Sequence, residues 1–144
     1  MEWKVISYLS LCGVAFGLAT VFAVISGHEY WIAALLLVSI GKVAVLLARQ
    51  RPARNSFASG AGVVLAALWT QALLMPEYLS NNPEYAAPIL PLGLSERWFT
   101  LVFSPVGALG GGLIAAFGGA VCRWPSRRAR ASRSVLNHSD RNEP

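Results

Sequence analysis

Charged side chains are scarce in this chain: they make up 13% of its 144 residues, whereas 55% of the residues are hydrophobic. Soluble domains carry about 25% charged residues. The few charges also cluster in short segments between long apolar runs. This composition excludes an ordinary soluble domain and indicates a small integral membrane protein with a single domain.

Cysteine and histidine are equally rare, with two of each. Cys12 and Cys122 are isolated, so no CxxC motif, Cys/His cluster or disulfide framework can be built from them. His28 lies in a short turn and His138 in the tail, which does not suit a bis-histidine haem site. We therefore expect no metal and no cofactor.

Acidic residues are missing from the apolar segments, which leaves no carboxylate for a proton relay or an ion-coupled transport site. A nucleophile–base pair is not apparent either. The glycine-rich stretch 107–113 lacks the Lys-Ser/Thr that follows a phosphate-binding loop. We expect no catalytic residues and no enzyme activity.

Four apolar segments are present, and each is long enough to cross a membrane as a helix. About 20 residues, rising 1.5 Å each, cross a hydrocarbon core of about 30 Å. The sequence predicts an all-α fold, a four-helix transmembrane bundle in a domain 1–124, followed by a basic, disordered tail 125–144. The predicted helices cover about residues 5–27, 30–48, 56–75 and 99–122.

Basic residues concentrate in the loop after the second segment and in the tail, whereas the opposite connections, 28–29 and 76–98, are mainly acidic. The positive-inside rule then places both termini and the loop 49–55 in the cytoplasm. We expect a multi-pass protein of the bacterial cytoplasmic (inner) membrane. The net charge is +5, and most of the basic residues lie next to the membrane spans. We therefore expect anionic lipids, not nucleic acid, as partners of this protein. The arginines expected at lipid headgroups are Arg49, Arg51, Arg54, Arg123, Arg127 and Arg128.

The long connection 76–98 contains four prolines, which exclude a continuous helix. Aromatic residues flank the outer ends of the predicted helices, as in an interfacial aromatic belt. These belt residues are Tyr30, Trp31, Tyr78, Tyr85 and Trp98.

Lys42 lies inside an apolar segment, where a charge costs a few kcal/mol even on the gentlest insertion scale. One interpretation is that its stem follows the helix and its ammonium reaches the inner headgroups. The other is that Lys42 pairs with a second protein or a lipid phosphate, because the other segments offer no acidic partner. The sequence leaves both open.

Small residues recur at four-residue spacing in the first and fourth segments, a pattern that lets helix backbones approach closely in lipid. These faces pack either within the bundle or against a larger partner. The residues concerned are Gly13, Gly17, Gly107, Gly111 and Ala115.

Residues 5–80 contain an apolar helix with a lone lysine. A basic turn and a third helix follow it, and the third helix ends in an acidic-aromatic pair. The segments "YWIAALLLVSIGKVAVLLARQRP", "LWTQALL" and "PEYL" carry this pattern. It resembles the small subunit IV-type accessory subunits of bacterial haem–copper oxidases and the small subunit of nitric-oxide reductase. The resemblance implies a subunit without redox centres that supports assembly or stability.

We therefore expect an accessory or assembly subunit of a larger membrane complex, with a respiratory complex as the first candidate and other membrane-protein subunits as partners. The alternative is a small homo-oligomeric transporter or channel in which Lys42 lines an anion path. A third hypothesis, compatible with both, is a regulator whose arginine-rich tail binds anionic lipids.

Overall fold

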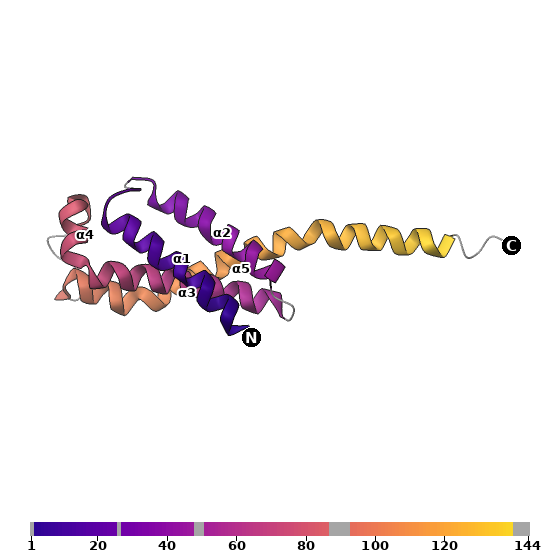
Figure 1. The fold of residues 1–144 in the computed structure, drawn as a ribbon, viewed down its shortest axis with the longest axis horizontal. Helices are drawn as coiled ribbons and strands as arrows, with labels where there is room; N and C mark the ends of the chain where they lie inside the picture. Colours follow the sequence, from indigo (N-terminus) through magenta and orange to yellow (C-terminus); the bar gives the residue numbers. More distant parts are fainter. Residues whose placement is uncertain (1, 26, 48–50, 87–92, 140–144) are drawn as a thin grey trace.

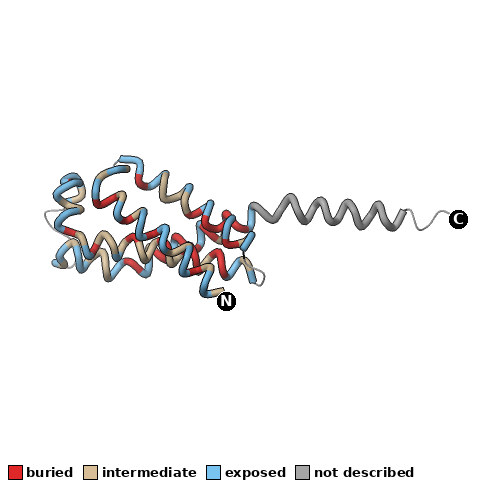
Figure 2. Tube along the Cα trace, viewed as in Figure 1, coloured by how far each residue is buried: buried red, intermediate tan, exposed pale blue. Residues whose placement is uncertain are grey.

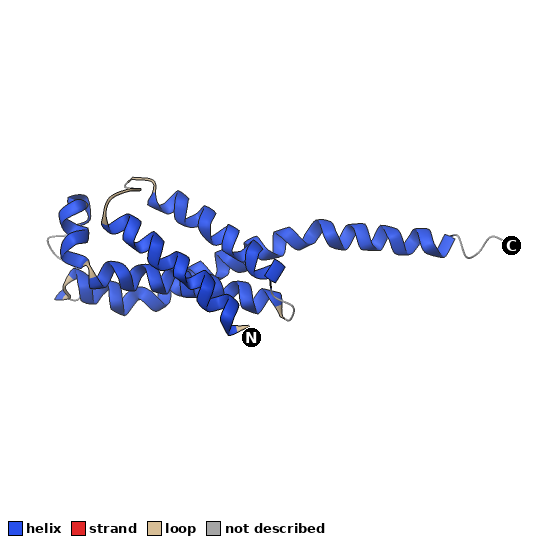
Figure 3. Ribbon diagram, in the orientation of Figure 1, coloured by secondary structure: helices blue, strands red, loops and turns tan. Residues whose placement is uncertain are grey.

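The computed structural model describes residues 2–25, 27–47, 51–86 and 93–139, with side chains described as far as Val121. The described chain consists of helices joined by turns and short loops (Figure 3). In the part of the chain that the structure describes, four helices are long and apolar enough to cross a membrane, which confirms the predicted all-α fold with four candidate membrane spans. In chain order they are α1 (Trp3–Val21), α2 (Glu29–Leu47), α3 (Pro52–Leu73) and the Glu96–Val121 part of α5 (Glu96–Ser139).

Successive spans run in opposite directions, so the bundle has two distinct ends (Figure 1). The α1–α2 turn lies at one end together with α4 (Met75–Asn81) and the 3-10 helix η1 (Pro83–Tyr85), and we call this the α4 end. The start of α1, the end of α2 and the start of α3 lie at the other, the N-terminal end (Figure 1). Helix α3 is central, since it packs against α1, α2 and α5, while α2 also packs against α5.

Helix α1 ends at Val21, six residues before the predicted boundary. Ala23 has a φ of 53°, in the left-handed region that a non-glycine residue seldom adopts, and Gly27 has a φ of 78°. Asn81 and Asn82 of the α4 end donate to the carbonyls of Val21 and Thr20 at 3.0 and 3.1 Å. The bond from Asn81 satisfies a carbonyl at the helix end, and the bond from Asn82 adds a second donor to the Thr20 carbonyl, which also accepts the Ala23 N–H at 3.1 Å. Helix α1 therefore stops where α4 caps it.

The connection 76–98 is not continuous helix, as its prolines predict, but it contains α4 and η1. Pro76 lacks an N–H and cannot continue the hydrogen bonds of α3, so the chain bends at Leu74 and α4 turns away from the α3 axis (Figure 1). Residues 87–92 lie outside the described residues.

Helix α5 continues to Ser139, whereas the sequence predicts a disordered tail from residue 125. Alanine and arginine, which are frequent in this segment, are strong helix formers. Extending an existing helix also avoids the cost of nucleating a new one. Residues 140–144, the remainder of the predicted tail, lie outside the described residues.

Candidate functional site

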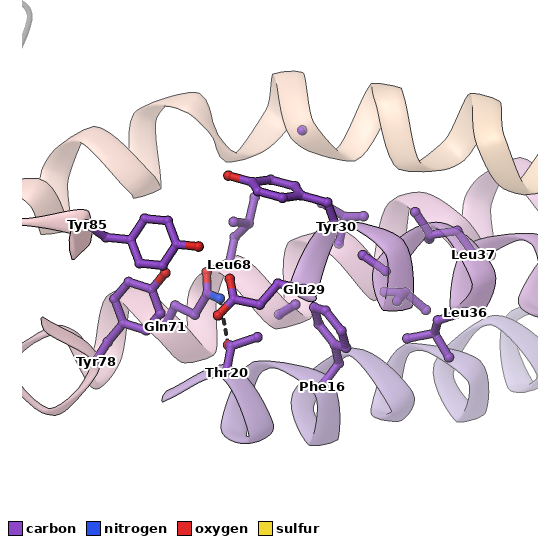
Figure 4. Close-up of a pocket in the computed structure, with 15 residues that line it drawn as sticks. Phe16, Thr20, Glu29, Tyr30, Leu36, Leu37, Leu68, Gln71, Tyr78 and Tyr85 are labelled. Carbon is purple, nitrogen blue, oxygen red and sulfur yellow. Dashed lines mark hydrogen bonds between the residues drawn. The ribbon is translucent and has the colours of Figure 1, made fainter. Parts of the chain in front are cut away.

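A cavity of about 460 Å³ lies between the helices toward the α4 end of the bundle. Its polar side chains gather at one end, while leucines such as Leu36 and Leu37 line the other (Figure 4). A volume of this size falls within the range of about 300–1,000 Å³ that small-molecule sites occupy. The lining residues are Phe16, Thr20, Glu29, Tyr30, Ala33, Leu36, Leu37, Val63, Val64, Ala67, Leu68, Gln71, Tyr78, Tyr85 and Gly107.

Asn82 is the residue that fixes α4 across this end of the bundle. Its side chain is fully buried, and its Nδ2 donates both to the Thr20 carbonyl and, at 3.0 Å, to the Tyr78 carbonyl. Since Tyr78 lines the cavity, the same side chain holds the end of α1 and the turn of α4 that carries the tyrosine. The sequence gives no sign of this role, because an asparagine in a proline-rich connection is also an ordinary turn residue.

Polar side chains of α1 and α3 meet beside the cavity. Gln71 donates from Nε2 to the Thr20 hydroxyl at 2.7 Å, and that hydroxyl donates to the Gly17 carbonyl at 2.8 Å (Figure 4). Thr20 is 1% exposed. The chain of bonds therefore satisfies both groups and ties the two helices together at the polar end of the cavity.

Glu29 is the functional candidate that the sequence analysis missed. It is the first residue of α2, not part of the preceding turn, and it is 9% exposed. Its carboxylate reaches into the polar end of the cavity, where Oε1 is buried and accepts no hydrogen bond (Figure 4). The prediction that no membrane span carries an acid is therefore wrong, because two candidate spans begin with one: Glu29 in α2, one residue before the predicted start, and Glu96 in α5, three residues before it.

Tyr78 and Tyr85 line the polar end of the cavity, where the sequence predicts members of an aromatic belt. Their rings stack with centroids 5.9 Å apart and planes 22° apart. Burial raises the pKa of Tyr78, with a further contribution from Glu29, whereas the nearby Glu29 carboxylate is the largest cause of the raised pKa of Tyr85. Both phenols therefore stay protonated at physiological pH and offer O–H donors.

The other predicted belt residues are largely exposed and suit that prediction better. Trp31 is 76% exposed near the start of α2, and Trp98 is 61% exposed near the start of α5, so both lie toward the α4 end of the bundle. Tyr30 is 79% exposed but also lines the cavity. The cavity therefore reaches the molecular surface beside Tyr30.

Lys42 is exposed on the outside of α2, five residues before the helix ends at Leu47. Ser39, one turn earlier, is exposed as well. Among the residues that the structure describes, none forms a hydrogen bond or ion pair with Lys42, and Lys42 does not line the cavity. Neither interpretation of this lysine involves the interior of the bundle.

The small residues singled out from the sequence lie against helices of the same chain. Gly13 and Gly17 of α1 face the backbone of α3 at Val63 and Ala67. In α5, Gly107 lies against Leu68, Gly111 lies against Val64 and Gly60, and the buried Ala115 contacts Gly41 and Gly60. These faces are therefore occupied within the bundle and do not form a free surface for another protein.

The arginines predicted at lipid headgroups are placed only in part. Arg51 and Arg54 are exposed at the N-terminal end of the bundle. Arg49 lies outside the described residues, and Arg123, Arg127 and Arg128 belong to α5, where side chains are not described. The headgroup assignment stays a prediction.

No group of three or more histidine, cysteine, aspartate or glutamate side chains that could hold a metal ion occurs in the described ranges. Comparison with known proteins adds no assignment, because no family model, curated protein or solved structure matches this chain. The function is therefore argued from the chain's own geometry.

Proposed function

We propose that this protein is an accessory subunit of a larger membrane complex in the bacterial inner membrane and that it contacts its partner through the outer face of α2. The observation that carries this proposal is the exposure of Lys42 in the middle of an apolar face. Leu35, Val38 and Leu46 are exposed on the same helix, at 69%, 40% and 74%. Such a charge is costly in lipid unless it reaches water or a partner.

A transmembrane helix with an acidic side chain at the depth of Lys42 is the partner that this charge fits best. The bundle itself is complete without that partner, because its glycine faces are filled by its own helices. A snorkelling lysine is the competing explanation: Lys42 lies about 7.5 Å along the axis from Leu47, within reach of the headgroups for a long side chain.

The resemblance of residues 5–80 to accessory subunits of haem–copper oxidases makes a respiratory oxidase the first complex to examine. In this proposal both termini lie in the cytoplasm, and the arginines at the N-terminal end of the bundle contact anionic headgroups. The protein supplies binding and stability, while the partner subunits carry the redox centres.

The alternative function, a homo-oligomeric anion transporter, makes a different demand on Lys42. Because this side chain lies on the outside of α2, an anion path lined by it has to run between copies of the chain. The identity of the chain next to α2, another subunit or a second copy of this protein, therefore distinguishes the two functions.

The test is site-specific photocrosslinking in the native membrane from position 39, one turn from Lys42, with position 113 of α5 as the matched control. Leu113 is also an exposed side chain, at 65%, but on another helix. We expect a crosslink from position 39 to one other subunit, at a peptide that contains an acidic residue, and its loss in K42Q. A reduced-minus-oxidised spectrum of the purified complex then reports haem.

Crosslinks from position 39 to lipid alone, unchanged in K42Q, would show that Lys42 snorkels and would overturn the proposal. Crosslinks to a second copy of this chain, in a colourless preparation, would favour the transporter. K42R is the conservative control, because it keeps the charge and should keep the crosslink.

A further inference from the structure

The polar end of the cavity contains an acid without a counter-charge. Glu29 is 9% exposed, and its Oε1 is buried without a hydrogen-bond partner. None of the fifteen lining residues is a lysine, an arginine or a histidine. An unpaired buried acceptor is destabilising, and more so when it is charged, so this site is suited to a ligand that brings a donor or a positive charge.

Aromatic rings surround the same point. Tyr30, Tyr78 and Tyr85 all line the cavity with Glu29, and the last two stack on each other (Figure 4). Ring faces attract ammonium groups, and quaternary ammonium ligands are recognised by aromatic cages. A second carboxylate, Glu84, acts on Tyr78 and Tyr85 in the same direction as Glu29, since it also raises the pKa values of these two phenols. The local field therefore favours a cation.

The rest of the cavity is apolar. The apolar side chains that line it include Phe16, Leu36, Leu37, Val63 and Leu68. Burying apolar surface against such side chains is favourable in proportion to the area removed from water. The exposed Tyr30 marks an opening at the surface of the bundle beside α2, so a flexible tail can enter from the side.

We propose that this cavity binds a single-chain amphiphile with a protonated or quaternary amine as its head. The amine lies beside Glu29 within reach of the tyrosine rings, and the alkyl tail extends along the leucines of α2. An anionic amphiphile is disfavoured, because its head would meet Glu29 without a basic side chain among the lining residues. A hydrocarbon tail alone would leave Glu29 Oε1 unpaired.

This inference is independent of the proposed accessory role, because it concerns the interior of the bundle and not the outer face of α2. It is tested with two photoreactive probes of equal length, each with a diazirine near the end of a ten-carbon tail. One probe has a trimethylammonium head and the other a sulfate head. The purified full chain in lipid nanodiscs is labelled with each probe, and the labelled peptides are mapped by mass spectrometry.

We expect the ammonium probe to label the α2 and α3 segments that line the cavity and unlabelled decyltrimethylammonium to compete with it. The sulfate probe should label these segments no more than the lipid-facing part of α5. In E29Q, competition by decyltrimethylammonium should be at least about tenfold weaker, which corresponds to about 1.4 kcal/mol. E77Q is the matched control, because Glu77 is an exposed acid of α4 that does not line the cavity.

A33F keeps the test decisive if E29Q fails to fold. Ala33 lines the cavity from α2, so a phenylalanine there fills the apolar part while the carboxylate remains. We expect A33F to lose the labelling and to keep the helical content and elution volume of the wild type. Equal labelling by both probes, or equal competition in E29Q, E77Q and wild type, would overturn the proposal and leave a cavity that holds water or lipid tails.

The amphiphile can come from the membrane or from solution, and lipid extraction separates the two sources. An amine-headed lipid that co-purifies with the wild type and is lost from E29Q identifies a membrane source. Competition by decyltrimethylammonium without any such lipid identifies a free amphiphile.

Discussion

The two ends of the bundle differ in how closely their helices approach: small residues bring the helices together at the N-terminal end, whereas larger side chains and the cavity separate them at the α4 end. Toward the N-terminal end, α2, α3 and α5 meet through backbone contacts between Gly41, Gly60, Ala115, Gly118 and Gly119 and their neighbours. We call these five residues the glycine seam. Figure 2 shows buried positions gathered where these helices converge. At the α4 end the same helices are separated by larger side chains and by the cavity.

The difference follows from the interactions that hold each end together. Helices in lipid gain little from hydrophobic association, so close backbone packing supplies the stability of the seam. The α4 end instead relies on hydrogen bonds from Asn81, Asn82 and Gln71, which satisfy carbonyl and hydroxyl groups of α1. Such bonds hold the helix ends at a fixed separation and leave a space between them.

Adding a Cβ within the glycine seam should have the largest effect on stability. A Cβ at Gly41 would collide with the backbone carbonyl of Ala115, which cannot move without α5. We expect G41A to lower the free energy of unfolding by about 1–3 kcal/mol, the usual cost of overpacking, or more. Thermal unfolding in detergent, followed by far-UV circular dichroism, measures this change.

Gly110 is the control for this substitution, because a Cβ there meets nothing within 4 Å. G110A should be neutral or stabilise by up to about 1 kcal/mol, since alanine favours the helix more than glycine does. Equal destabilisation by G41A and G110A would contradict the close packing of the seam.

At the α4 end, N82A should have the next largest effect. The substitution removes the donor to the Thr20 and Tyr78 carbonyls and leaves both without that partner. We expect a loss of about 1–2 kcal/mol, the net value of two hydrogen bonds, because each carbonyl keeps a backbone donor, the Ala23 N–H for Thr20 and the residue 82 N–H for Tyr78. Hydrogen exchange with mass spectrometry should show the loss as faster exchange in α4.

S80A is the matched control for N82A, because the exposed Ser80 hydroxyl donates only to the Glu77 carbonyl within α4, at 3.1 Å. Its effect should be within about 0.5 kcal/mol, as is usual for surface substitutions. If S80A and N82A accelerate exchange equally, the bond from Asn82 to α1 does not hold α4 in place.

The charge of Glu29 should be visible in the titration of the two stacked tyrosines. E29Q removes the largest cause of the raised pKa of Tyr85 and a secondary cause of the raised pKa of Tyr78, so both values should fall, that of Tyr85 by the greater fraction of its shift. Because the folded state holds these protons more tightly, the contribution of the two tyrosines to wild-type stability should be constant below pH about 10 and decrease above it.

Nuclear magnetic resonance of tyrosine labelled with carbon-13 at Cζ measures the two pKa values, with Y78F and Y85F assigning the signals. E77Q should leave both tyrosines unchanged, because Glu77 contributes to neither shift. An unchanged pKa of Tyr85 in E29Q would show that the carboxylate does not face the tyrosine.

The sequence predicts the spans but not the site, and the reason is physical. A run of about 20 apolar residues satisfies its backbone only as a helix, so hydropathy alone finds the four spans. Glu29 was missed because hydropathy does not fix a helix start to one residue, and that residue decides between a turn and the cavity. The capping by Asn82 joins residues 62 positions apart, a contact that no local pattern contains.

The serines of α3 should give the smallest effects and compare a paired with an unpaired hydroxyl. Ser56 and Ser59 are both fully buried in the half of α3 nearest the N-terminal end. The Ser56 hydroxyl shares its one proton between the carbonyls of Gly41 and Pro52, at 3.1 and 2.9 Å, whereas the Ser59 hydroxyl has no hydrogen-bond partner. S56A should therefore cost about 1 kcal/mol, the net value of a typical hydrogen bond.

S59A removes a buried polar group that gains nothing from its surroundings, so it should be neutral or slightly stabilising. Both variants replace serine by alanine in the same helix, one turn apart, so the change in helix propensity is the same in each. Unfolding in detergent by far-UV circular dichroism measures both. If S59A is as costly as S56A, the Ser59 hydroxyl has a partner, and the helices around it are held by a further polar contact as well as by the glycine seam.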